Sequence, residues 1–329
     1  MRGQFQQAIH QLSEQCLPLA QQMGDSSRLL QAQWMMGQIL FHLGEIRSAR
    51  EHVERALALY DPRQHRSRAV QDFGVTSQSY LSWGLWFLGY PDQALATSHK
   101  ALALAQELSH SFGEAIALIF AAGLHQFRGD GHTAQELAEK AIALCQEQGF
   151  PVWLAFGLIT RGWALAGQGQ EEEGIAQIRQ GLTAWQARGM EASRPLALAL
   201  LAEAYAKVGQ AEEGLRLLSE ALAVVHSTEE RIYEAELFRL KGELTLQQSS
   251  ARSPESEAES CFLKAINIAQ KQQAKSWELR ASMGLARLWQ QQGKKDEAHQ
   301  LLSDIYNWFT EGFDTADLQE AKALLEELI

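Results

Sequence analysis

One pattern dominates the 329-residue sequence: a glycine is followed five residues later by a small residue, and the combination recurs along almost the whole chain. Successive small residues are spaced by 41, 45, 40, 40, 40, 44 and 40 positions. A steady period of this length indicates a repeat protein, in which each unit packs mainly against its neighbours. The glycines are Gly3, Gly44, Gly89, Gly129, Gly169, Gly209 and Gly293, and the small residues are Ala8, Ala49, Ala94, Ala134, Gly174, Gly214, Ala258 and Ala298.

Each unit has the pattern of two helices joined at the glycine. In the first full unit, an apolar stretch over Leu29–Leu43 leads through Gly44 into a second stretch over Ile46–Tyr60. Glycine accepts the positive φ that ends a first helix, and the small residue lets the two helices approach closely. The second helix carries one apolar stripe, which includes Ala49 and Val53. One hairpin cannot cover both of its apolar faces, so the pairs must stack, and no strand pattern is present.

The order of residues in these units resembles the tetratricopeptide repeat family, whose unit places a Leu-Gly pair and a Tyr in the first helix and small residues in the second. The common unit of that family is ~34 residues long, so the helices or linkers are longer in this chain. Pairing of the HEAT type is the structural alternative. The matching residues are Met36, Gly37, Leu40, Ala49, Val53 and Ala56 in the first full unit, and Leu201, Ala202, Tyr205, Gly214, Leu218 and Ala221 in the fifth.

The resemblance implies an all-α fold, a right-handed α-solenoid of about seven helix pairs with repeats of about 40 residues. Gly3 and Ala8 match the turn and second helix of a unit whose first helix is missing. Asp314 or Thr315 is suited to be the N-cap of a last, amphipathic helix. We therefore expect one continuous domain over residues 1–329, with a truncated repeat at 1–24, seven pairs at 27–313 and a capping helix at 314–329.

Three shorter stretches, Tyr60–Ser67, Leu88–Ala94 and Trp308–Leu318, are similar to the C-terminal repeat arm of large bacterial signalling proteins. Those proteins join a nucleotide-cyclase output domain, or a DNA-binding one of the LuxR/MalT type, to a signalling ATPase that precedes the arm. The half unit at the chain start also predicts that this chain continues a longer protein. The resemblance implies a sensor or interaction arm.

Charge and composition argue against several partners and locations. The formal net charge is −11 and the isoelectric point is about 5.4, which opposes attraction to phosphate backbones and anionic membranes. We expect no nucleic-acid or membrane partner. No apolar run has the length of a bilayer span and no signal peptide is present, which predicts a cytoplasmic protein. Cys16, Cys145 and Cys261 show no disulfide or metal spacing, and we expect all three to be small core residues.

Patterns that carry catalysis or bind cofactors do not occur in the sequence. The phosphate-binding pattern GxxxxGK[ST] is absent, so this segment does not carry the nucleotide chemistry of the proteins that it resembles. There is also no HExxH, GxSxG or spaced set of Cys and His. We therefore expect a protein that is not an enzyme, with no catalytic residue, no metal and no cofactor.

Large aromatic residues recur in the first helices, which line the concave surface of tetratricopeptide arrays. Aromatic side chains give rigid contact area where a partner is held, although a helical tryptophan also packs between helices. The later units carry Glu236, Arg239, Glu243, Arg280, Arg287 and Gln290 at equivalent positions, so we expect the groove to change from aromatic to charged. The candidate binding residues are Trp34, Phe41, Trp83, Trp86, His125, Phe127 and Trp163, with Phe87 beside them.

Together these features favour a regulatory or sensor module of a larger bacterial signalling protein, one that binds a protein or peptide in a concave helical groove. An output or ATPase domain upstream in the same polypeptide is one candidate partner, and a small-molecule effector is another. The alternative is a structural oligomerisation scaffold without a specific small ligand.

Overall fold

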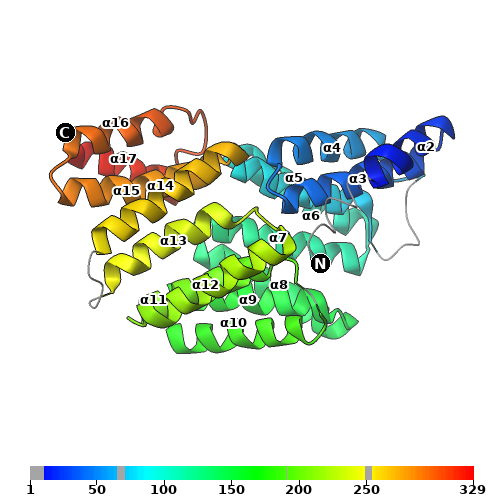
Figure 1. The fold of residues 1–329 in the computed structure, drawn as a ribbon. Coiled ribbons are helices and arrows are strands. Elements are labelled where there is room, and N and C mark those ends of the chain that lie inside the picture. Colours follow the sequence, from blue (N-terminus) through cyan, green and yellow to red (C-terminus); the bar gives the residue numbers. More distant parts are fainter. Residues whose placement is uncertain (1–10, 65–70, 190, 249–253) are drawn as a thin grey trace.

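The computed structural model describes residues 11–64, 71–189, 191–248 and 254–329, and these ranges contain helices and no strand (Figure 1). The predicted all-helical class is confirmed. The elements are a π-helical turn η1 (Leu12–Cys16), α2 (Leu17–Gln22), α3 (Ser26–His42), α4 (Ile46–Leu59), α5 (Phe73–Phe87), α6 (Pro91–Leu108), α7 (Ser111–Phe127), α8 (Gly131–Gln148), α9 (Pro151–Gly167), α10 (Glu171–Gln186), α11 (Arg194–Lys207), α12 (Ala211–Thr228), α13 (Glu234–Gln247), α14 (Pro254–Gln272), α15 (Lys275–Gln291), α16 (Lys295–Tyr306) and α17 (Ala316–Leu328).

From α3 to α16 the helices pack as consecutive pairs, and the turn inside most pairs is built on the predicted glycine. Gly44 has a φ of 81°, and its amide donates to the carbonyl of Phe41 while the next amide donates to Leu40. These two hydrogen bonds close the helix in the manner of a Schellman turn. The predicted glycines at 89, 129, 169, 209 and 293 also have positive φ. Gly3 and Ala8 lie outside the described residues.

Small residues bring the two helices of a pair together, as the sequence predicts. In α9 and α10, a methyl group added at Gly174 would lie 2.5 Å from the carbonyl oxygen of Gly162. Ala94, Ala134 and Ala258 of the other second helices have no exposed surface. A larger side chain at these positions would push the two helices apart.

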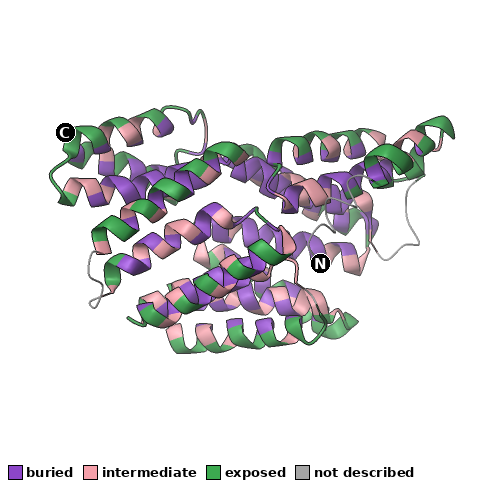
Figure 2. Ribbon diagram, in the orientation of Figure 1, coloured by how far each residue is buried: buried purple, intermediate pink, exposed green. Residues whose placement is uncertain are grey.

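The first helix of each pair lies in an inner layer and the second lies outside it. In α7, thirteen of seventeen residues are buried, whereas only four of the eighteen residues of α8 are buried, all on one stripe. Consecutive first helices also contact each other, from α3 with α5 to α13 with α15. A helix that is apolar on all sides is one that is packed on all sides. Figure 2 shows this contrast between buried and exposed helix faces.

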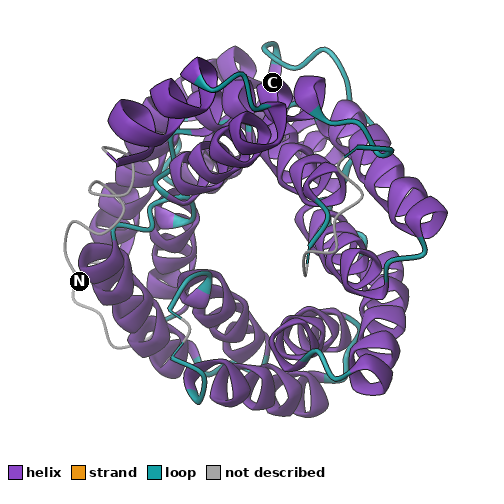
Figure 3. Ribbon diagram, turned by 90° about the vertical axis from the view of Figure 1, so that its right-hand side faces the viewer, coloured by secondary structure: helices purple, strands orange, loops and turns teal. Residues whose placement is uncertain are grey.

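The pairs curve until the last ones meet the first ones. Seen from the side in Figure 3, the helices run around a ring, and Figure 1 shows α14 and α15 beside α4 and α5. The turn glycines of the first three pairs make this contact, because a methyl group added to each would lie close to a residue near the chain end. We call it the closing contact: Gly44 with Gln272 (2.5 Å), Gly89 with Trp308 (2.6 Å) and Gly129 with Ala316 (3.0 Å).

Hydrogen bonds in the closing contact end on the last carbonyl groups of the first helices. Such carbonyls have no partner inside their own helix. The carbonyl of His42 in α3 accepts from the amide of Arg231, at 2.8 Å. The carbonyl of Trp86 in α5 accepts from the hydroxyl of Ser276, and that of Phe127 in α7 accepts from the guanidinium of Arg280. The later pairs therefore cap the helices of the earlier pairs.

Predictions for single residues have different outcomes at the two ends of the described chain. Cys145 is buried and Cys261 is half-buried, but Cys16 is exposed, so the expected core position is wrong for Cys16. It lies beside α2, which packs mainly on α3. At the other end, Thr315 is the N-cap of α17, as predicted, although its hydroxyl donates to the carbonyl of Gly312 and does not cap the helix. Among the described helices, none combines the length and apolar content needed to cross a bilayer.

Replacing Gly89 with alanine should destabilise the protein more than the same change at Gly209. Both residues have positive φ, 87° and 74°, so each variant carries the strain of a left-handed alanine, ~1–2 kcal/mol. A methyl group at Gly209 meets nothing within 4 Å, whereas one at Gly89 meets Trp308 and Lys275. Overpacking there should add ~1–3 kcal/mol. Urea unfolding measures both losses, and equal losses would contradict the closing contact.

Candidate functional site

An aromatic cavity lies on the inner side of the first pairs, and we call it the aromatic chamber. Its volume is about 190 Å³. Four consecutive first helices, α3, α5, α7 and α9, supply most of its wall, and α10 and the segments before α11 and α13 complete it. The lining residues are Gln38, Phe41, His42, Tyr80, Trp83, Ile119, Phe120, Val152, Trp153, Phe156, Trp185, Ala192, Ser193 and Tyr233.

Aromatic residues three positions apart on one helix face build the wall. Tyr80 and Trp83 both pack on Phe120, with ring centroids 4.9 and 4.5 Å apart. The indole nitrogen of Trp83 also donates to the carbonyl of Phe120, at 2.7 Å. Opposite them, Phe156 meets Trp185 edge to face at 4.4 Å. These contacts fix the rings, so the chamber is formed before any ligand arrives.

A buried carboxylate holds one side of the chamber in place. The side chain of Glu230 is fully buried, and both of its oxygens lie 2.9 Å from the amide of Ser193. One oxygen also lies 2.8 Å from Nδ1 of His42. Ser193 has a φ of 63°, a left-handed conformation that needs such support. Glu230 thereby ties the end of α3 to the segments that precede α11 and α13.

Two tyrosine hydroxyls give the chamber its polar character. The hydroxyl of Tyr80 accepts from the amide of Gln38 at 2.8 Å, and burial raises the pKa of Tyr80 to about 12. Burial also raises the pKa of Tyr233 well above its ordinary value. The Tyr233 hydroxyl is buried and has no hydrogen-bond partner among the described residues. Both groups stay neutral at ordinary pH, so each keeps a proton to donate.

Only part of the predicted binding set lies at the chamber. Phe41 and Trp83 line it. Trp86 and Phe127 stack on each other at 5.0 Å in the closing contact and are 2% and 0% exposed, so the last pairs cover them. Phe87 is buried in the same cluster. That these covered residues bind a partner stays a prediction.

The three remaining predicted residues lie in separate surroundings. Trp34 is buried against Phe73, with ring centroids 5.3 Å apart. His125 lies 3.1 Å from a carboxylate oxygen of Asp130, and burial lowers the pKa of this histidine despite that neighbour. Trp163 donates to Glu203. The seven residues therefore do not form one continuous patch.

Sequence reasoning found only Phe41 and Trp83 among the fourteen residues that line the chamber. Aligning the units on their turn glycines selects the C-terminal halves of the first helices, but Trp153 and Phe156 lie at the beginning of α9. Trp185 belongs to a second helix, α10, whereas all candidate residues were taken from first helices. The aromatic spacing of three residues in α9 was the one available signal. Tyr233 precedes α13, and nothing in the repeat pattern indicated its place.

The charged inner positions of the later pairs form an ion-pair network. Arg239 binds Glu236 at 2.7 Å, and Arg280 lies between Glu236 at 3.5 Å and Asp317 at 2.8 Å. Burial alone would raise the pKa of Glu236, but Arg239 and Arg280 outweigh burial and leave the pKa below its ordinary value. Arg280 also lies 5.1 Å from the ring of Trp86. These charges satisfy one another and support the closing contact.

Metal binding finds no support in the described ranges, where no three His, Cys, Asp or Glu side chains gather in a way that could hold an ion. The chamber is lined by aromatic rings, the neutral hydroxyls of two tyrosines and the uncharged side chains of Gln38 and Ser193, with His42 at one side. Such a wall is suited to bind an apolar group and to orient it through a few hydrogen bonds.

Comparison with known proteins identifies the class of the chain. The family model described as Tetratricopeptide repeat matches residues 30–55, 195–220 and 279–303. An uncharacterized protein of Rhizobium meliloti (strain 1021) is 22% identical over 292 residues, which is 88% of this chain and 28% of that protein. The chain thus spans less than a third of the length of this curated relative.

Several solved structures have a similar fold. A Rap protein complexed with Competence and Sporulation Factor has a TM-score of 0.65 at 12% identity, covering 97% of this chain and 80% of that one. NprR in complex with its cognate peptide NprX has a TM-score of 0.58 at 16% identity, covering 87% and 81%. Aspartyl phosphate phosphatase F from Bacillus subtilis has a TM-score of 0.54 at 14% identity, covering 88% and 74%. The chain is a tetratricopeptide-like repeat region.

Replacing Glu230 with glutamine should destabilise the protein, although the two side chains have the same shape. The amide oxygen can keep the contacts with His42 and Ser193, but the NH2 group then replaces the oxygen that accepts only from the amide of Ser193, so a donor faces a donor. Leaving a buried donor unpaired costs ~1–3 kcal/mol. Glu234, half-buried in the first turn of α13, is the matched control and should change by less than ~0.5 kcal/mol. If urea unfolding gives similar losses of stability for the two variants, Glu230 does not hold the wall of the chamber in place.

Proposed function

We propose that this chain is the peptide-binding sensor region of a larger bacterial signalling protein. The observation that carries the proposal is the aromatic chamber, a formed cavity walled by rings from four consecutive first helices. Its volume of about 190 Å³ suits one ring-sized or branched apolar group, since a cavity of roughly 150 Å³ accommodates benzene. A side chain of a peptide is a group of this size.

The comparisons support a peptide as the ligand. Tetratricopeptide-like folds bind protein or peptide partners, and two structures with a similar fold are complexes with Competence and Sporulation Factor and with the peptide NprX. The curated relative is more than three times as long as the segment that this chain matches. That length supports the view that the region works beside other domains, among which an output or ATPase domain is the proposed receiver.

Occupancy of the chamber would be transmitted through the array itself. A ligand there touches Phe41 of the first pair, Phe156 of the fourth and Tyr233, which precedes the sixth. Such a ligand binds more tightly when these pairs are in contact than when they are apart, so it favours the closed arrangement. The proposed role is regulatory and requires no catalytic residue.

Peptide binding should depend on an apolar side chain and on Trp153. Fluorescently labelled pentapeptides of glycine and serine, with Phe, Leu or Ser at the centre, are titrated with the protein and followed by polarisation. The Phe and Leu peptides should bind and the Ser peptide should not. Trp153→Ala should weaken binding by about tenfold or more, the loss typical of an aromatic anchor.

Trp289→Ala is the control for the loss of a partly exposed tryptophan, because Trp289 is half-buried and lies outside the chamber. It should leave peptide affinity unchanged. Equal binding of all three peptides, or equal losses in the two tryptophan variants, would contradict the proposal and favour an oligomerisation scaffold.

A further inference from the structure

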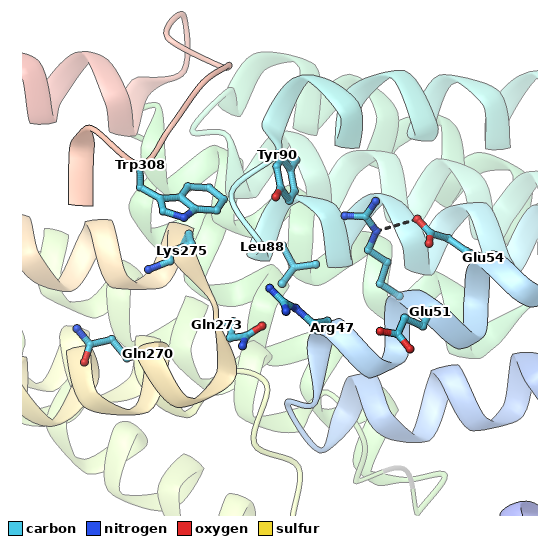
Figure 4. Close-up of a pocket in the computed structure, with 10 residues that line it drawn as sticks. Arg47, Glu51, Glu54, Leu88, Tyr90, Gln270, Gln273, Lys275 and Trp308 are labelled. Atoms are coloured by element: carbon cyan, nitrogen blue, oxygen red, sulfur yellow. Dashed lines mark hydrogen bonds and ion pairs between the residues drawn. The ribbon is translucent and has the colours of Figure 1, made fainter. Parts of the chain in front are cut away.

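A second concavity lies on the outside of the closing contact and has a volume of about 520 Å³ (Figure 4). We call it the junction groove. One wall comes from α4 and the turn before α6, and the other comes from the end of α14, the beginning of α15 and the segment after α16. The lining residues are Arg47, Arg50, Glu51, Glu54, Leu88, Tyr90, Gln270, Gln273, Lys275 and Trp308.

Both carboxylates of the junction groove are paired within their own helix. Glu54 lies 2.7 Å from Arg50, and Glu51 lies 3.5 Å from Arg55, which is outside the groove. On the facing wall, Lys275 lies 2.7 Å from Glu278. A lysine ammonium has three donors, so Lys275 keeps hydrogen-bonding capacity for a ligand.

Arg47 differs from the other charged residues of the junction groove. Its side chain is exposed, and no hydrogen bond or ion pair joins its guanidinium to any described residue. Figure 4 shows it extending from α4 toward Leu88 and Gln273 on the far side. The whole protein carries a formal charge of −11, so an unpaired arginine directed into a groove is a local exception.

Flat apolar surface lies next to these cations. The rings of Tyr90 and Trp308 approach to 5.5 Å from opposite walls, and Trp308 remains 36% exposed. Arg50 lies 5.7 Å from the Tyr90 ring, and Lys275 lies 5.7 Å from the Trp308 ring. Leu88 is buried beneath them. The groove therefore presents positive charge beside an aromatic surface.

We propose that the junction groove binds a carboxylate attached to a flat apolar group. Arg47 pairs with the carboxylate, because a guanidinium offers two parallel donors that match its two oxygens. Lys275 contributes a second positive charge, and the apolar part of the ligand packs on Trp308 and Tyr90. A small aromatic acid and a peptide with an acidic residue beside an aromatic one share this chemistry.

The position of the junction groove gives such a ligand a structural consequence. Arg47 belongs to the first pair and Lys275 to the seventh, so a bound carboxylate contacts both ends of the array at once. Opening of the closing contact would separate the two cations. The ligand therefore binds more tightly to the closed arrangement than to the open one, and its binding stabilises the closed arrangement.

Calorimetric titration at neutral pH tests the proposal with two acids and their uncharged amides: phenylacetate against phenylacetamide, and acetyl-Phe-Asp-amide against acetyl-Phe-Asn-amide. At least one acid should bind with a dissociation constant on the order of 1 mM or below, as expected for ligands of this size. Its amide should bind at least about tenfold more weakly. Tighter binding of phenylacetate would indicate a small aromatic acid as the ligand, and tighter binding of acetyl-Phe-Asp-amide would indicate a peptide.

Variants distinguish binding in the junction groove from a general effect of charge and from binding in the aromatic chamber. Arg47→Gln and Lys275→Gln should each weaken acid binding by about threefold to tenfold or more. Lys271→Gln, an exposed lysine of α14 outside the groove, makes the same change of charge and should have no effect. Trp153→Ala should also leave acid binding intact, because the chamber is a separate site.

The acid should raise the melting temperature of the unaltered protein and should not raise that of Arg47→Gln. Equal affinity for acid and amide, no binding of either acid at ~10 mM, or equal losses in Arg47→Gln and Lys271→Gln would overturn the proposal.

Discussion

The closing contact is the constraint on which the rest of the structure depends. The last carbonyl groups of each inner helix have no partner inside that helix, so they need partners from elsewhere in the protein. Here the partners come from the far end of the chain: an amide at Arg231 for α3, a hydroxyl at Ser276 for α5 and a guanidinium at Arg280 for α7. Arg280 also places positive charge at the negative end of α7. Closing the ring therefore completes the hydrogen bonding of the first three pairs.

Both proposed binding sites are products of that contact. The aromatic chamber needs Glu230 and Tyr233 from the sixth unit beside His42 of the first. The junction groove needs Lys275 opposite Arg47. Neither site exists within a single pair, so a ligand at either one reports on the relative position of pairs that are far apart in sequence. A sensor of the kind we propose would need no moving loop, because its binding sites are formed by the curvature of the whole array.

Local features of the fold could be predicted from the sequence, because each depends on a few neighbouring residues. The positive φ at Gly44 and the close approach at Gly174 follow from the absence of a side chain. The turns between pairs were harder to foresee, since Ser109 and Glu229 have positive φ without being glycines. Tertiary packing imposes that strain, and no local sequence pattern predicts it.

The candidate site was only partly predictable, for a related reason. Trp83, one of the aromatic positions predicted on first helices, lines the chamber. Trp86 lies three residues further along the same helix, yet the seventh pair covers it. Which of the two remains beside a cavity depends on the curvature of the array. Curvature is the sum of small rotations over many units, and one repeat does not specify it.

The contact between Trp86 and Trp277 allows the most direct test of the closed arrangement. Their rings lie 4.9 Å apart, edge to face, although the residues are separated by most of the array. A double-mutant cycle with Trp86→Leu and Trp277→Leu, measured by urea unfolding, isolates their interaction. Residues in contact give a coupling free energy of ~0.5–3 kcal/mol. That result is expected here, whereas losses that add within ~0.3–0.5 kcal/mol would show that the second and seventh pairs do not meet.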